Sequence, residues 1–139
     1  MHHLRIFWPI FFSVTLCACD ERTVAAPQPA PAGSTVSIVS IVPTTDTVLV
    51  PGTSTRFELK VAYTLSVDSG TIDAVFQDAK GEVLSLTRAK VSKGTGNEDF
   101  TVAIKIPETE SVQLFVPLGA EGQTATSTIA TRTYKVSKR

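Results

Sequence analysis

The side chains that carry most enzyme chemistry gather at the start of this 139-residue chain. His2, His3, Cys17, Cys19 and the only tryptophan all precede residue 20, and neither histidine nor cysteine occurs afterwards. Beyond Cys19, therefore, no Ser-His-Asp or Cys-His arrangement can form, and no histidine or cysteine can bind zinc or copper. We expect the rest of the chain to be non-catalytic and to hold no metal or cofactor.

Carboxylates are the acid–base groups that remain. Glu108 and Glu110 lie two residues apart, and Glu98 adjoins Asp99. A glycosidase needs two such groups on either side of one bond in a shaped cleft, and a small domain without tryptophan offers little room or stacking surface for a sugar. We interpret both pairs as solvated loop charges, and a hydrolase that uses them is the enzymatic alternative. Residues 93–96, Lys-Gly-Thr-Gly, lack the strand-to-helix setting of a phosphate loop and predict a turn.

The remaining candidates are two tyrosines and a basic C-terminal end. For Tyr63 and Tyr134 we expect buried rings whose hydroxyl groups reach a backbone partner or the rim. Tyr134 at the edge of a binding surface is the alternative. The basic end is expected to be solvated and comprises Arg132, Lys135, Lys138 and Arg139.

An apolar segment near the N-terminus has the form of a targeting signal. Arg5 precedes a nearly unbroken apolar run from Ile6 to Leu16, which the charged residues 20–22 end abruptly. A positive start and an apolar run of about 7–15 residues are typical of a secretory signal peptide. A membrane-spanning helix needs about 20 apolar residues, so this run is too short to be one.

The residues that follow suggest how the signal is removed. Leu16, Ala18 and Cys19 match an aliphatic–x–small–Cys pattern, which resembles the lipobox of bacterial lipoproteins; Cys17 departs from the residue types usual between them. The resemblance implies a signal peptide over residues 1–18 and lipidation of Cys19 at the new terminus. Ordinary cleavage after Ala26 is the alternative, and it would release a soluble periplasmic protein.

Lipidation also bears on localisation. Asp20, directly after the lipidated residue, resembles the inner-membrane retention signal of enterobacterial lipoproteins, so we expect the chain to face the periplasm, with the inner membrane favoured over the outer. Residues 19–34 contain Pro27, Pro29 and Pro31. This composition predicts a flexible, extended tether. Since Cys17 leaves with the signal, the domain must be stable without a disulfide.

Residues 35–138 have the composition and periodicity of β-strands. Val, Ile, Thr, Leu and Phe are frequent, and these residues suit a pleated, half-buried surface. Apolar residues alternate with polar ones over several segments, which predicts strands with one buried face. The segments are 36–42 with 47–50, 56–65, 72–76, 83–86, 100–106, 112–118 and 129–136, with Pro117 suggesting an edge or a strand end.

Turn residues separate these segments at intervals near ten residues. We expect turns at 51–52, 68–70, 78–81, 93–97 and 119–122, and a hairpin at 78–81. About seven short antiparallel strands predict an all-β domain, an immunoglobulin- or fibronectin-like sandwich, with a small closed barrel as the alternative. In residues 61–65, 91–96 and 100–107 the chain resembles the immunoglobulin-like domains of bacterial surface proteins, although the paired cysteines and core tryptophan of antibody domains are absent.

These observations favour a lipid-anchored protein of the bacterial cell envelope with a non-catalytic domain. Its function is interpreted as protein interaction or structural support, with a membrane contact through the lipid and an envelope protein as partner. Thirteen basic and thirteen acidic residues balance, and no basic block occurs, so nucleic acid is not expected as a partner. A small-ligand or carbohydrate-binding module is the alternative function.

Overall fold

The computed structural model describes residues 33–123, 126 and 128–138, and this part of the chain is all-β. The strands pair antiparallel in one sheet, and the described residues contain no helix, hence none that could cross a membrane. Its five strands are β1 (Thr35–Val42), β2 (Ser54–Asp78), β3 (Val83–Lys105), β4 (Ser111–Ala120) and β5 (Thr128–Lys135). The predicted signal peptide, Cys19, Asp20 and most of the tether lie outside the described residues.

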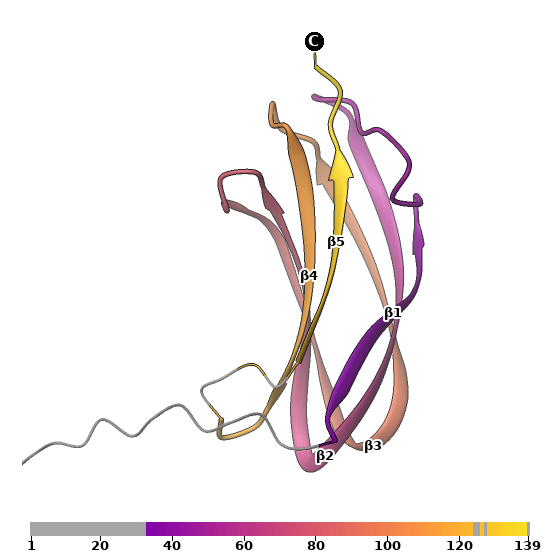
Figure 1. The fold of residues 1–139 in the computed structure, drawn as a ribbon, viewed down its shortest axis with the longest axis vertical. Coiled ribbons are helices and arrows are strands. Elements are labelled where there is room, and N and C mark those ends of the chain that lie inside the picture. The colour runs from indigo at the N-terminus through magenta and orange to yellow at the C-terminus, as the bar shows by residue number, and fades with distance from the viewer. Residues whose placement is uncertain (1–32, 124–125, 127, 139) are drawn as a thin grey trace, which may run out of the picture.

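The two longest strands, β2 and β3, form a hairpin that bends back on itself. Phe57 and Phe76 both belong to β2, yet their ring centroids lie 4.7 Å apart. In a straight strand, residues this far apart in sequence would be separated by about 60 Å. The bend coincides with a register shift in the β2–β3 ladder between Leu65 and Ser69, and Figure 1 shows it at the end of the molecule opposite the C-terminus.

The bend divides the sheet into two halves with different strand partners. In the half that we call the β1 half, residues 54–65 of β2 lie between β1 and residues 94–105 of β3. In the β4 half, residues 70–78 of β2 lie between residues 83–91 of β3 and β4, and β4 also pairs with β5. The curled sheet thus has an inner surface, where the halves face each other, and two outer faces.

The inner surface is the hydrophobic core. The period-two pattern places the predicted apolar residues inside, and this prediction is confirmed for the main strand segments. Phe57 contacts Phe76 and also Tyr134 of β5, at ring-centroid distances of 4.7 and 5.3 Å, so one aromatic cluster joins both halves. The largest fully buried side chains include Tyr134, Phe57, Phe76, Leu65, Ile72, Ile106, Leu114 and Leu118.

The structure has five strands rather than the expected seven or so, because two of the predicted turns lie inside long strands. Residues 68–70 belong to β2 and residues 93–97 belong to β3. The two segments lie close to one another in the ladder, where Leu65 pairs with Gly94 and Ser69 with Ser92. Gly94 has a φ of +112°, a conformation that few other residues adopt. At this point the turn residues let β2 and β3 bend together, and neither strand reverses its direction.

Two smaller predictions were also wrong. Pro117 lies within β4, between β2 and β5, rather than at an edge. The β2–β4 ladder is interrupted between the pairs Ile72–Leu118 and Val75–Phe115, so the N–H that proline lacks breaks no β2 pair. Residues 47–50 form no strand and make only one bridge, between Leu49 and Val136. The hairpin at residues 78–81 is confirmed.

Candidate functional site

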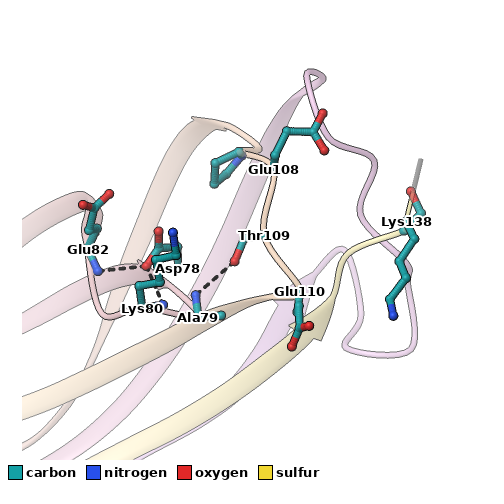
Figure 2. A pocket seen from close by; sticks show the side chains of 10 residues that line it. Asp78, Ala79, Lys80, Glu82, Glu108, Thr109, Glu110 and Lys138 are labelled. Carbon is teal, nitrogen blue, oxygen red and sulfur yellow. Dashed lines mark hydrogen bonds between the residues drawn. The ribbon is translucent and has the colours of Figure 1, made fainter.

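Two of the hollows and the two outer faces are places where the described residues could meet another molecule. The larger hollow, of about 880 Å³, lies where the β2–β3 turn, the β3–β4 loop and the residues after β5 come together (Figure 2). We call it the turn-end hollow. It is lined by Asp78, Ala79, Lys80, Glu82, Pro107, Glu108, Thr109, Glu110, Ser137 and Lys138.

Side-chain-to-backbone hydrogen bonds fix one wall of the turn-end hollow. Asp78 is buried, and its Oδ1 accepts hydrogen bonds from the backbone N–H groups of Lys80 and Glu82 at 2.8 and 2.9 Å. The backbone N–H of Ala79 donates to Thr109 Oγ1 at 3.1 Å. The Asp78 carboxylate is therefore used to hold the turn, and the bond to Thr109 ties the turn to the β3–β4 loop.

Glu108 and Glu110, the predicted carboxylate pair, both line this hollow. Figure 2 shows their side chains pointing in different directions, on either side of Thr109, and both residues are exposed. Acid–base cleavage of a glycosidic bond requires two carboxyl groups that flank one bond, and these two do not converge. No group of three or more His, Cys, Asp or Glu side chains within the described ranges is placed to hold a metal ion.

The second hollow, of about 420 Å³, lies near the bend and is called the bend hollow. Polar side chains from β3 and from the residues after β4 surround it, including Lys90, Ser92, Glu121 and Gln123. Gln123 Oε1 is buried without a hydrogen-bond partner. A Cβ added to Gly70 would lie 2.5 Å from the backbone oxygen of Gly119, so two backbones approach closely beneath this hollow.

The outer face of the β1 half is largely polar, although the exposed Val42 pairs with Glu58 and therefore lies on it. Glu58 and Lys60 of β2 lie opposite Thr101 and Asp99 of β3, which places all four side chains on one surface. On this face charged residues of both signs and threonine lie where the period-two pattern predicts solvent contact. Glu98 and Asp99, predicted to adjoin a turn, instead lie within β3.

The outer face of the β4 half is apolar at its centre. Val75 of β2 pairs with Leu86 of β3 on one side and with Phe115 of β4 on the other, while Pro117 of β4 pairs with Ile129 of β5. Partners in antiparallel strands share a face, so these five side chains form one surface, which we call the apolar outer face. Leu86 and Ile129 are 54% and 51% exposed.

One ion pair is set into this apolar surface. Arg88 Nε and NH2 donate to the two carboxylate oxygens of Asp73, both at 2.7 Å. The hydrogen bond to Asp73, together with its negative charge, raises the pKa of Arg88. The Asp73 side chain is only 13% exposed. The two opposite charges therefore lie together beside the row of Leu86, Val75 and Phe115, and no isolated charge interrupts this row.

Both tyrosines lie where a structural role was predicted. Tyr134 is fully buried, and its hydroxyl donates to the backbone oxygen of Pro43 at 2.7 Å. Burial raises the pKa of Tyr134 to about 12. Tyr63 is partly buried and packs on the core, and its ring lies over Gly96, its partner across the ladder. Neither tyrosine lines the two hollows.

The predicted basic end is not one patch. Successive residues of a strand point to opposite sides of the sheet. Arg132 pairs with Leu114, whereas Lys135 pairs with Ser111, so their side chains lie on opposite sides. Lys138 lines the turn-end hollow, and Arg139 lies outside the described residues.

Comparison with known proteins yields a likeness in fold only. No protein-family model and no curated protein matches the chain. A solved structure of a candidate beta-galactosidase from Bacteroides fragilis is 14% identical, with a TM-score of 0.50, over 73% of this chain; the match spans only 15% of that protein. The C-terminal domain of wzt is 15% identical, with a TM-score of 0.43, over 82% of this chain and 77% of that domain.

Proposed function

We propose that this chain is a lipid-anchored protein of the bacterial cell envelope whose β-domain is a non-catalytic module for protein interaction. The apolar outer face is the observation that carries the proposal. Contiguous exposed apolar surface rimmed by polar residues marks interaction sites on soluble domains. The core does not require this surface, because the inner faces of both halves are already buried against each other.

The domain is proposed to be an immunoglobulin-like sandwich. Its five strands can be counted as seven segments when β2 and β3 are divided at the bend, with three segments in the β1 half and four in the β4 half. The ring contact between Phe57 and Tyr134 across the two halves supports packing of two layers on one core. Such a domain presents its outer faces and strand edges to partners.

The membrane anchor is proposed on the sequence of residues 16–20 alone. Cys19 is the lipid attachment point, Asp20 favours retention at the inner membrane, and residues 19–34 hold the domain in the periplasm. We expect Cys19→Ser to move the protein from the membrane fraction to the soluble periplasmic fraction. A Cys19→Ser variant that still sediments with membranes would contradict lipid anchoring, and release of the unaltered chain into the soluble fraction would favour cleavage after Ala26.

Crosslinking in intact cells tests the interaction. Leu86→Lys introduces a charge on the apolar outer face, whereas Val42→Lys makes a comparable change at a valine that is 58% exposed in the β1 half. We expect Leu86→Lys to lose the crosslinked species that the unaltered chain and Val42→Lys both form. Equal crosslinking by both variants would show that this face is not used.

A small polar ligand, such as a carbohydrate, is the second candidate. The unpartnered Gln123 Oε1 in the bend hollow favours it, since a buried acceptor without a partner is rare in proteins. The candidate beta-galactosidase does not add to this case, because the likeness concerns the fold alone. Glycan-array binding that is lost in Lys90→Ala together with Gln123→Ala would support a ligand site, and binding unaffected by both would exclude this hollow.

A further inference from the structure

We propose that the apolar outer face binds the same face of a second copy of this chain, forming a two-fold symmetric dimer. The inference rests on the proposed function, because it names the partner of the same surface. A two-fold contact uses one patch on both subunits, which must therefore be complementary to itself. Three features of the face meet this condition: its apolar centre, its charge arrangement and its size.

The apolar centre can face a copy of itself without burying an unpaired charge. The row formed by Leu86, Val75 and Phe115 crosses three strands, and Pro117 and Ile129 extend it onto β5. The charges beside this row are those of Asp73 and Arg88, which already hydrogen-bond to each other. Burying a charge whose partner is kept is far less costly than burying one alone.

The other two basic side chains of the face, Lys90 and Lys135, do not lie opposite a lysine of the second copy in the proposed dimer. Lys90 lies on β3 at the bend end of the face, and Lys135 lies on β5 at the other end. A two-fold axis in the plane of contact and parallel to the strands exchanges the two sides of the face, and one perpendicular to the strands exchanges its two ends; we propose one of these two arrangements, because a diagonal axis would set each lysine against its own copy. From strand and residue spacings, either choice leaves the ammonium groups of the two copies more than about 14 Å apart, which exceeds the screening length of about 8 Å at physiological salt.

The face is also large enough for a dimer. Four strands at about 4.8 Å spacing and five rows of outward residues at about 6.8 Å give about 600–700 Å² for the whole outer side of the β4 half, which consists of the apolar outer face and the polar residues around it. A standard interface buries about 800 Å² on each partner. The turn-end and bend hollows, by contrast, are lined largely by polar side chains and offer no comparable flat apolar area.

Light scattering on the purified full chain in detergent, over a range of protein concentrations, tests the inference. We expect the unaltered chain to pass from monomer to dimer as concentration rises. Leu86→Lys replaces a leucine that the dimer would bury on both subunits, so the dissociation constant should rise about 100-fold or more. Val42→Lys, changed at a comparably exposed position in the β1 half, should dimerise like the unaltered chain. Circular dichroism checks that both variants are folded.

Two outcomes would overturn the dimer, and they differ in what they say of the proposed function. An unaltered chain that is monomeric at every concentration refutes self-association, yet the interaction role stands if Leu86→Lys still loses a crosslinked envelope protein in cells. A dimer that Leu86→Lys and Val42→Lys leave equally intact refutes the assignment to this face. If Leu86→Lys neither weakens the dimer nor loses a crosslinked species in cells, the inference and the proposed function are overturned together.

Discussion

The two outer faces of the curled sheet share the strands β2 and β3 but have different surface chemistry. On the β1 half, residues such as Glu58 and Lys60 alternate with the buried side chains of β2. On the β4 half, Val75 is an outward residue of β2, and Phe115 and Pro117 of the neighbouring β4 lie on the same face. Burial of the inner surface accounts for folding in both halves, so it does not account for this difference. The apolar character of one outer face is better explained by contact with another molecule.

The largest expected effect compares how closely the backbone is packed in the two halves. Gly70→Ala in the β4 half would place a Cβ 2.5 Å from the backbone oxygen of Gly119, whereas Gly96→Ala in the β1 half would meet the tip of the Tyr63 side chain at 2.7 Å. The strand backbone cannot move aside, but a partly buried ring can turn. We expect Gly70→Ala to lower the free energy of unfolding by about 2–3 kcal/mol and Gly96→Ala by about 1 kcal/mol. Chemical denaturation measures both, and equal losses would contradict the difference in packing.

A smaller effect concerns Tyr134, which joins both halves in the core. Tyr134→Phe removes the hydrogen bond to Pro43 and should lower the free energy of unfolding by about 1 kcal/mol at neutral pH. Burial raises the pKa of Tyr134 to about 12, whereas an unfolded tyrosine ionises near pH 10. The stabilisation of the neutral phenol is therefore complete below about pH 10 and is lost as the pH rises towards 12.

Denaturation of the unaltered chain and of Tyr134→Phe across this alkaline range checks the sign. The unaltered chain should lose stability more steeply than the variant. Parallel pH profiles would show that Tyr134 ionises as readily in the folded chain as in the unfolded one.

The smallest effect compares the ion pairs on the two outer faces. Arg88 and Asp73 make two hydrogen bonds, and Asp73 is largely covered, whereas Arg56 and Glu58 make one contact at 3.2 Å with both side chains more than half exposed. Solvent and salt weaken exposed pairs. Double-mutant cycles with alanine should give a larger coupling for Asp73–Arg88 than for Arg56–Glu58. Equal couplings would remove this distinction between the faces.

Much of the inner architecture could be predicted from the sequence. Period-two alternation correctly placed Phe57, Leu59 and Val61 inside, and likewise the alternate residues from Phe100 to Ile106 and from Val112 to Leu118. The strand count could not be predicted the same way. The glycine-containing segments at residues 68–70 and 93–97 have turn composition, and only the pairing of β2 with β3 makes them a shared bend.

Period-two alternation predicts one buried face per strand, so it does not reveal an apolar outer face. Residues 112–118 read Val-Gln-Leu-Phe-Val-Pro-Leu, so Phe115 and Pro117 break the expected polar positions. Val75 does the same between Ala74 and Phe76. These departures are a visible signal, but the register of four strands is needed to bring them onto one surface. The sequence indicates Glu108 and Glu110 as a carboxylate pair, but the hollow that they line depends on the geometry of the loops.

Solvent labelling of the two outer faces in intact cells tests the central claim most directly. Leu86→Cys and Val42→Cys place a thiol at positions that are 54% and 58% exposed in the isolated chain, so a membrane-impermeant thiol reagent should modify both at similar rates after purification under conditions that separate partners. In the envelope, we predict that Val42→Cys is modified rapidly while Leu86→Cys is protected. Equal modification of the two thiols in cells would contradict the claim that the apolar outer face is an occupied interaction surface.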